Sequence, residues 1–222
     1  MRAWKVAGTI GCALVLSVAL AQARSHHHHH ARSNKPGVFD YYVLSLSWSP
    51  QHCASHDTSA SDPQCGSHRK YAFVVHGLWP QYESGFPQSC ASGGGLDQTV
   101  VDSVTDIMPS PALIRHEWAK HGTCSGMDPA TYFGKVRAAY SALKIPAAYQ
   151  NPGKALRIPA SQIKEGFEQA NSGVGTSDLA VLCSGKFLEE VRVCFDKNLH
   201  PRNCGPDVRD HCGSEVVVRP VR

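Results

Sequence analysis

The segment HEWAKHGTC, residues 116–124, gathers side chains that can do acid–base chemistry on a polyanion. Two imidazoles, a carboxylate and an ammonium group fall within six positions, as His116, Glu117, Lys120 and His121. A helical H-E-x-x-H zinc site needs its two histidines four residues apart on one face. Here they are five apart, and a helix turns about 100° per residue, so the two rings diverge by roughly 140°. The four polar side chains still share one side of the helix, which predicts a charged stripe suited to a polyanion.

A second segment, HGLWPQ at residues 76–81, places another histidine at the end of an apolar stretch. Gly77 and Pro80 force the chain to turn there, so the imidazole of His76 is expected at the rim of the domain. A lone histidine in such a place is more often a core residue with satisfied ring nitrogens. Its occurrence together with the charged stripe favours a functional role instead.

The pattern of apolar residues predicts the elements that position these two segments. Alternating aromatic and β-branched residues predict strands over 39–50 and 69–80, and LAVLC and FLEEVRVCFD predict two later strands. Apolar residues at helical spacing, caps and prolines predict helices over 97–108, over the charged stripe up to Gly122, over 128–143 and over 161–170. Strands, then helices, then strands indicate an α+β fold, with an antiparallel β-sheet core and helices packed on one side.

The N-terminus predicts export. Arg2 and Lys5 precede an apolar run of about eleven residues, and Ala21-Gln22-Ala23 supplies the small residues that a signal peptidase reads. A membrane-spanning helix is the alternative, but it needs roughly 20 apolar residues. Residues 1–23 are therefore expected to be a signal peptide, and the mature protein is expected in the periplasm or outside the cell, free of the membrane.

A low-complexity stretch with five consecutive histidines follows the signal peptide, and residues 24–37 are predicted to be a disordered His-rich leader. The histidines are either a tag or a native tract with modest metal affinity, and a flexible tract cannot hold a preorganised catalytic site. The rest of the 222-residue chain, residues 38–222, is long enough for one substantial core and is predicted to be a single, monomeric domain.

Charge and cysteine content narrow the class further. Arg2 and Lys5 leave with the signal peptide, so 20 of the 22 Lys and Arg residues face 18 Asp and Glu, a net charge of about +2. A sequence-reading DNA binder carries a denser basic face, so any nucleic-acid contact is expected to be local. Eight cysteines remain in an exported chain, which predicts four disulfides, although cysteine count alone leaves on the order of 100 pairings open.

The two segments, in this order and about forty residues apart, resemble the two sequence motifs of the ribonuclease T2 family of exported endoribonucleases. The resemblance extends from FDYYVLSLSWSP through the terminal cysteines. It implies metal-independent, cofactor-free cleavage of single-stranded RNA by attack of the 2′-OH, through a 2′,3′-cyclic phosphate, with no cleavage of DNA. It also implies roles: His121 as general base, His76 as general acid, and His116, Glu117 and Lys120 as stabilisers of the phosphate and the transition state. Two histidines suit this chemistry because an imidazole exists in either form near neutral pH.

Base recognition is less constrained by the residue types. Trp79 and Tyr82 can stack on a base, a contact worth roughly 1 to 3 kcal/mol and tolerant of base identity. Packing in the core is the alternative for both, while Trp48 and Trp118 are assigned to the core. Plant members of the family carry a base-recognising glutamine where this chain has Ser47, so no base preference is carried over and low specificity is expected.

The resemblance also implies a disulfide pairing. A bridge between Cys90 and Cys124 would tie the helix of the charged stripe to the loop after HGLWP. The remaining cysteines would pair as Cys53 with Cys65, Cys183 with Cys212, and Cys194 with Cys204.

Two other functions compete with an active ribonuclease. One is a catalytically weakened RNA-binding or toxin-like module of the same fold, against which the intact His76, Glu117, Lys120 and His121 argue. The other is a metal-dependent hydrolase, against which the five-residue histidine spacing argues.

Overall fold

The computed structural model describes Met1 and residues 34–56, 61–66, 70–92 and 94–221. The predicted signal peptide beyond Met1, and the predicted leader up to residue 33, lie outside the described residues. Arg32–Arg222 forms one compact unit. Residues 34–37, predicted to be leader, are part of this unit: the Gly37 N–H donates to the Cys124 carbonyl at 2.9 Å, and the Gln88 N–H donates to the Asn34 side chain at 3.3 Å.

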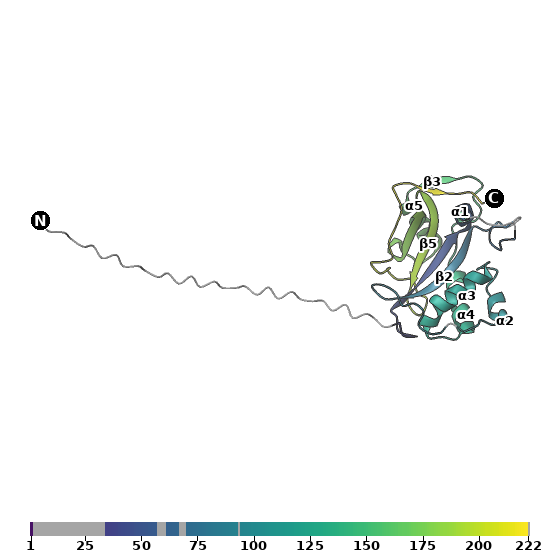
Figure 1. The fold of residues 1–222 in the computed structure, drawn as a ribbon. Coiled ribbons are helices and arrows are strands. Elements are labelled where there is room, and N and C mark those ends of the chain that lie inside the picture. The colour runs from purple at the N-terminus through teal and green to yellow at the C-terminus, as the bar shows by residue number, and fades with distance from the viewer. Residues whose placement is uncertain (2–33, 57–60, 67–69, 93, 222) are drawn as a thin grey trace. The chain divides into compact units, whose positions relative to one another are not determined.

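One sheet forms the centre of the fold, and β1 lies between β2 and β5 (Figure 1). The strands are β1 (Tyr41–Trp48), β2 (Phe73–Gln81), β3 (Leu156–Ile158), β4 (Leu179–Ser184), β5 (Phe187–Phe195) and β6 (Val216–Val218). Their order is β2-β1-β5-β6-β3, with β4 also paired to β5. Every pairing is antiparallel except that of β5 with β6, which is parallel. The predicted α+β fold is confirmed, with a mixed sheet in place of a purely antiparallel one.

Five α-helices and three 3-10 helices surround the sheet in the described part of the chain. They are α1 (Ser49–Ser55), α2 (Gln98–Asp102), α3 (Pro111–Lys120), η1 (Gly122–Ser125), α4 (Pro129–Ser141), η2 (Ala147–Tyr149), α5 (Ala160–Ala170) and η3 (Thr176–Asp178). Helices α3 and α4 each begin with a side-chain cap and a proline, and the start of α4 agrees with the prediction from Asp128 and Pro129. Ser110 caps α3 by accepting from the Leu113 N–H, Asp128 caps α4 by accepting from the Thr131 N–H, and each helix has a proline in its first turn.

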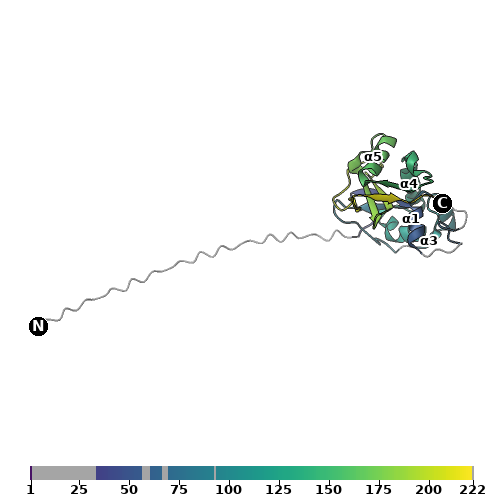
Figure 2. The same cartoon turned by 90° about the horizontal axis from the view of Figure 1, so that it is seen from above.

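The main core lies on one face of the sheet. Inward-facing Leu44, Leu46 and Trp48 of β1 pack there with buried apolar residues of α3, α4 and α5, which agrees with the prediction of helices on one side. Figure 2 shows α4 and α5 together above the strands. A smaller cluster on the opposite face includes Tyr41 and Val43 of β1, and it is covered by a loop segment rather than by a helix. Among the described residues no helix has both the length and the apolar content to cross a bilayer.

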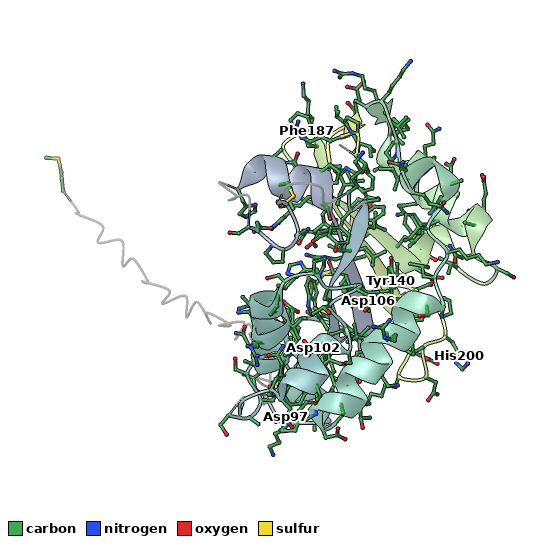
Figure 3. The ribbon with its side chains drawn as sticks, turned by 90° about the vertical axis from the view of Figure 1, so that its right-hand side faces the viewer. Asp97, Asp102, Asp106, Tyr140, Phe187 and His200 are labelled. Atoms are coloured by element: carbon green, nitrogen blue, oxygen red, sulfur yellow. A yellow bond between two sulfur atoms is a disulfide. The ribbon has the colours of Figure 1, made fainter. Side chains whose placement is uncertain are left out.

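Two predicted helix ends differ from the structure. The predicted helix over 97–108 ends at Asp102, and turns continue to Met108. The hydroxyl groups of Ser103 and Thr105 donate to backbone carbonyls three residues earlier, which competes with helix hydrogen bonding. Figure 3 shows Asp106, which follows this break, beside Tyr140 of α4. The carboxylate of Asp106 accepts a hydrogen bond from Arg137 of α4 at 3.0 Å.

Helix α3 ends at Lys120 instead of Gly122, and His121 is its C-cap residue. Gly122 does not have the left-handed conformation expected of a glycine that ends a helix; Gly126, with φ of 76°, adopts it at the end of η1. Gly122 allows close packing instead, because a Cβ there would lie 2.4 Å from the Trp118 ring.

Four disulfides join the described cysteines: Cys53–Cys65, Cys90–Cys124, Cys183–Cys212 and Cys194–Cys204. These are the pairs that the family resemblance implies. The Cys90–Cys124 bridge connects the loop after β2 to η1, directly after the helix with the charged stripe.

Candidate active site

A β-bulge presents His76. In the pairing of β1 with β2, Ser45 lies opposite Gly77 and Leu46 lies opposite Val75, so His76 is the extra residue between them. A bulge bends the strand and redirects a side chain. The side chain of His76 is 31% exposed, in a strand whose other residues are buried. The predicted turn at Gly77 and Pro80 is wrong, because β2 continues through both residues to Gln81 and His76 lies within the strand. The bulge, and not a turn, exposes the imidazole.

Two side-chain contacts hold β2 against the helices. The Tyr132 hydroxyl of α4 donates to the Leu78 carbonyl at 2.7 Å, and the Trp79 indole N–H donates to Glu117 Oε2 at 2.6 Å. Gly77 makes the second contact possible, because a Cβ at this position would lie 2.2 Å from Glu117 Oε2 and 2.4 Å from Trp79 Nε1. Figure 1 shows β2 next to α3. The glycine of HGLWP is therefore required by close approach of a carboxylate from the other motif.

A cleft of about 300 Å³ lies between β2, α3 and the loop that follows Cys204. Six residues singled out from the sequence line it: His76, Trp79, His116, Glu117, Lys120 and His121. Five further residues complete the lining: Gln81, Phe86, Arg192, Asp207 and Val208. Tyr82 does not line this cleft, and at 5% exposure its ring belongs to the main core.

Two imidazoles flank the Trp79 ring in this cleft. The ring centroid of Trp79 lies 5.2 Å from that of His76, in an edge-on arrangement, and 5.2 Å from that of His121. The indole also holds Glu117, so Trp79 fixes the positions of three other polar side chains. This contact pattern gives Trp79 a structural function inside the cleft in addition to any contact with a ligand.

His76 lies between two carboxylates. Its Nδ1 is 2.6 Å from Glu190 Oε1, and its Nε2 is 3.5 Å from Glu117 Oε1. Burial alone would lower the pKa of His76, but the hydrogen bond and charge of Glu190, together with the charge of Glu117, raise it above the usual 6.5. His76 is therefore favoured in its protonated form.

His121 has the opposite environment. Its side chain is buried, and nearby Lys120, His76 and His116 all disfavour a further positive charge. Burial, with these charges, lowers the pKa of His121 to about 3. Its Nδ1 is buried, and no group in the described residues makes a hydrogen bond to it, so Nε2 is the nitrogen left to face a ligand.

Glu117 is the most buried charged group of the cleft, with 2% of its side chain exposed. Burial raises its pKa, while His76 and the hydrogen bond from Trp79 act in the opposite direction. In contrast, His116 is exposed on α3 and Lys120 is half-buried. The charged stripe thus places one carboxylate inside and two basic groups where a ligand can reach them.

Three functional candidates were missed in the sequence. Glu190 and Arg192 are two positions apart on β5, and the predicted strand FLEEVRVCFD contains both, but nothing in the linear pattern connects them with His76. Phe86 is 48% exposed, an unusual state for a large apolar side chain, and its ring lies 6.0 Å from His121. In the sequence, the feature that could have indicated a role for Phe86 is its position in the loop after HGLWP.

No group of three or more His, Cys, Asp or Glu side chains within residues 34–56, 61–66, 70–92 and 94–221 is arranged to hold a metal ion. The cleft instead combines two imidazoles of opposite proton affinity with a carboxylate and an ammonium group. Such a cleft in a disulfide-bonded α+β fold defines a protein equipped for acid–base chemistry on a phosphate ester.

Comparisons with known proteins identify the family. The model of the ribonuclease T2 family matches residues 39–204. A ribonuclease from Aeromonas hydrophila is 39% identical over 169 residues, covering 72% of this chain and 74% of that protein. Ribonuclease I from Escherichia coli strain K12 is 25% identical over 257 residues, covering 87% of this chain and 94% of that protein.

Solved structures agree with this assignment. The RNase-related protein from Calystegia sepium superposes with a TM-score of 0.66 and 26% identity, covering 82% of this chain and 98% of that one. RNase NT in complex with 5′-AMP superposes with a TM-score of 0.62 and 25% identity, covering 82% of this chain and 99% of that one. The chain belongs to the ribonuclease T2 family, a family of endoribonucleases, so the resemblance noted in the two motifs is confirmed.

Proposed function

We propose that this protein is a secreted, metal-independent endoribonuclease that cleaves single-stranded RNA through a 2′,3′-cyclic phosphate. The observation that carries the proposal is the pair of histidines in one cleft: the pKa of His121 is lowered to about 3 and the pKa of His76 is raised. Between these values one ring is a neutral base and the other is a protonated acid. Cleavage by an internal hydroxyl needs this combination.

In the first step, His121 Nε2 takes the proton of the 2′-OH, and the resulting oxygen attacks the phosphorus. The bond from phosphorus to the 5′-oxygen breaks, and His76 donates its Nε2 proton to that oxygen. The products are a 2′,3′-cyclic phosphate and a 5′-OH. In the second step the roles exchange: His76 accepts a proton from water, and His121 returns its proton to the 2′-oxygen.

The remaining charged groups stabilise the phosphate. Lys120 and His116 lie at the open side of α3 and can contact the non-bridging oxygens, whose negative charge grows in the transition state. Glu117 is held by Trp79 and faces His76, so it orients the acid and balances the positive charge of the cleft.

Phe86 is the described aromatic side chain best placed to contact a base, because its ring is exposed and lines the cleft. Stacking on an aromatic ring tolerates every base, which supports low base specificity. Trp79 contributes mainly by positioning its polar neighbours.

Four disulfides support an oxidising compartment, either the periplasm or the outside of the cell. The expected partner is RNA, and the protein is proposed to act as a monomer.

The decisive experiment is digestion of a mixed-sequence RNA in excess EDTA, with analysis of the end groups. We expect full activity, 2′,3′-cyclic phosphate and 5′-OH ends, and no cut at a linkage carrying a single 2′-deoxy substitution. A water-activating metallonuclease would lose activity on chelation and could leave 5′-phosphate ends. Cleavage at the deoxy linkage would overturn the mechanism, and RNA binding without cleavage would favour the catalytically weakened module.

DNA of the same sequence serves as the matched control ligand. It should inhibit without being cut, because contacts to phosphate carry no sugar information. The inhibition should weaken as salt is added, since binding to phosphates releases counterions.

A further inference from the structure

The carboxylate of Glu190 is buried and lies next to the imidazole of His76, which belongs to another strand. Glu190 is on β5, His76 is on β2, and β1 lies between the two strands. Glu190 is paired with Ser47 of β1, and its side chain is 9% exposed. Ser45 and Ser47 alternate with the core residues Leu44 and Leu46, so their small side chains lie on the cleft side of the sheet. A carboxylate from β5 can therefore reach over β1 to the histidine.

Each oxygen of Glu190 has its own partner. Oε2 accepts from Arg192 twice, from Nε at 3.0 Å and from Nη2 at 2.8 Å. Oε1 is left for His76 Nδ1 at 2.6 Å. The guanidinium of Arg192 also stacks over the Trp79 ring, 4.9 Å from its centroid. The carboxylate is thus held in one orientation by groups that are themselves fixed.

Glu190 remains charged in this setting. Burial would raise the pKa of its carboxyl group, but the hydrogen bond and charge of His76, with those of Arg192, lower it to about 2. A charged acceptor at Nδ1 favours the tautomer with its proton on that nitrogen. The other groups that influence this cleft histidine are Glu117 of α3 and Arg192 of β5. Burial, with the charges of His56 and His76, lowers the pKa of His52 of α1.

We propose that Glu190, clamped by Arg192, is a positioning residue that keeps a proton on His76 Nδ1 and aims Nε2 at the leaving 5′-oxygen. The inference rests on the proposed role of His76 as the acid. It explains both steps: after Nε2 has delivered its proton, Nδ1 keeps its own, so the lone pair of the neutral ring is on Nε2. The same nitrogen then accepts a proton from water in the second step.

The test is the variant Glu190→Gln, with Glu189→Gln as the matched control. The control lies on the same strand and is exposed. A positioned acid contributes typically about 10² to 10⁴ to the rate. Because Gln keeps the shape and an acceptor but no charge, we expect Glu190→Gln to lose part of this, about 10- to 100-fold in kcat on a dinucleotide. We expect KM to change by no more than about twofold, and Glu189→Gln to behave as wild type. Equal behaviour of the two variants would overturn the proposal.

Two spectroscopic and kinetic readouts separate positioning from a merely structural effect. Nitrogen-resolved NMR of the His76 ring should show a lower pKa and a loss of the Nδ1–H tautomer in Glu190→Gln, but not in Glu189→Gln. The alkaline limb of the kcat profile should move to lower pH, because that limb reports the acid in its protonated form. An unchanged tautomer and an unchanged limb would overturn the proposal.

A substrate with an activated leaving group distinguishes this proposal from the proposed function. A uridine 3′-(para-nitrophenyl phosphate) releases a phenolate that needs no proton, so both His76→Ala and Glu190→Gln should lose most of their defect on it. If His76→Ala stays fully impaired, the assignment of His76 as the acid fails. If His76→Ala recovers and Glu190→Gln does not, the acid assignment stands and the role of Glu190 fails.

A second variant keeps the proposal testable if Glu190→Gln does not fold. Arg192→Lys retains one positive charge but cannot make the two-point contact to Oε2. We expect the same pattern with a smaller loss, about 3- to 10-fold in kcat, since the carboxylate stays but is less firmly held. Wild-type kinetics and a wild-type His76 pKa in a folded Arg192→Lys protein would contradict the clamp.

Discussion

The two faces of the central sheet differ in their side chains, although the same strands form both. One face is apolar and packs against helices, and the other carries the charged groups of the cleft. On one face, residues such as Leu44, Leu46 and Phe167 are fully buried among helices, and apolar burial stabilises the fold. On the other face, His76, Glu190 and Arg192 surround a cleft whose buried charges satisfy one another. Burying charges costs free energy even when they are paired, so this face is expected to serve function at some expense of stability.

The comparison shows that a single strand can serve both faces, because its side chains alternate between them. Successive side chains point to opposite faces, so β1 supplies the core with its leucines, while its small serines on the other face leave room for Glu190 to reach His76. Substitutions on the two faces should therefore separate activity from stability.

The largest expected effect is on activity, from either histidine. Replacing His121 or His76 by Ala should lower kcat toward a dinucleotide by a factor on the order of 10² to 10⁴, because a positioned base or acid is lost. Near-full activity of either variant would show that its assigned role is wrong.

The second largest expected effect is a loss of stability, from a substitution in the core. Phe167→Ala should destabilise the protein by about 3 to 5 kcal/mol, since a fully buried aromatic side chain is removed from α5. Denaturant unfolding measures this loss. Well below the unfolding temperature, kcat should stay within about twofold of wild type. A large fall in kcat with little loss of stability would break the division between the faces.

A single methyl group in the cleft should affect both quantities. In Gly77→Ala the new Cβ would meet Glu117 Oε2 and Trp79 Nε1, so the carboxylate must move. Overpacking typically costs about 1 to 3 kcal/mol, and we expect kcat to fall about tenfold or more.

The matched control for Gly77 is Gly134 of α4, where a Cβ would meet nothing within 4 Å. Gly134→Ala should be neutral in kcat and should stabilise the helix by roughly 0.5 to 1 kcal/mol. Equal kinetics for the two alanine variants would mean that the Glu117–Trp79 contact is dispensable.

The smallest expected effect concerns the shape of the pH profile of activity and not a loss of activity in a variant. Because His121 must be neutral and its pKa is lowered to about 3, kcat/KM should rise through an acidic limb near that pH. Because His76 must be protonated and its pKa is raised above 6.5, kcat/KM should fall through a limb above that pH. A bell-shaped profile of kcat/KM against pH with an optimum at mildly acidic pH is expected, since kcat/KM reports the acid and base of the free enzyme. An activity that still rises at pH 9 would show that no acid with the raised pKa of His76 takes part in the reaction.

Prediction from the sequence succeeded where local pattern was sufficient. The alternation in YYVLSLSW predicts β1, and Asp128 with the following proline predicts the start of α4. It failed at residues 103–108, where serine and threonine hydroxyl groups replace helix hydrogen bonds, and at residues 49–55, where a strand was extended to residue 50 but α1 begins at Ser49. At residues 103–108 the hydroxyl groups give backbone carbonyls another partner, and at residues 49–55 Pro50 occupies the first turn of α1.

In the candidate site, too, some features could be predicted from the sequence and others could not. Residue types and spacing in HGLWPQ and HEWAKHGTC were enough to predict which side chains gather and which chemistry they can do, because an acid, a base and cations are recognisable as types. Their proton affinities depend on burial and on distances of about 3 Å, which residues far apart in the chain create. Glu190 is 114 positions from His76, and only pairing of β1 with both β2 and β5 brings the two together. The sequence determined which types of side chain the cleft can use, while the tertiary structure decided their surroundings and so the direction in which each histidine pKa is shifted.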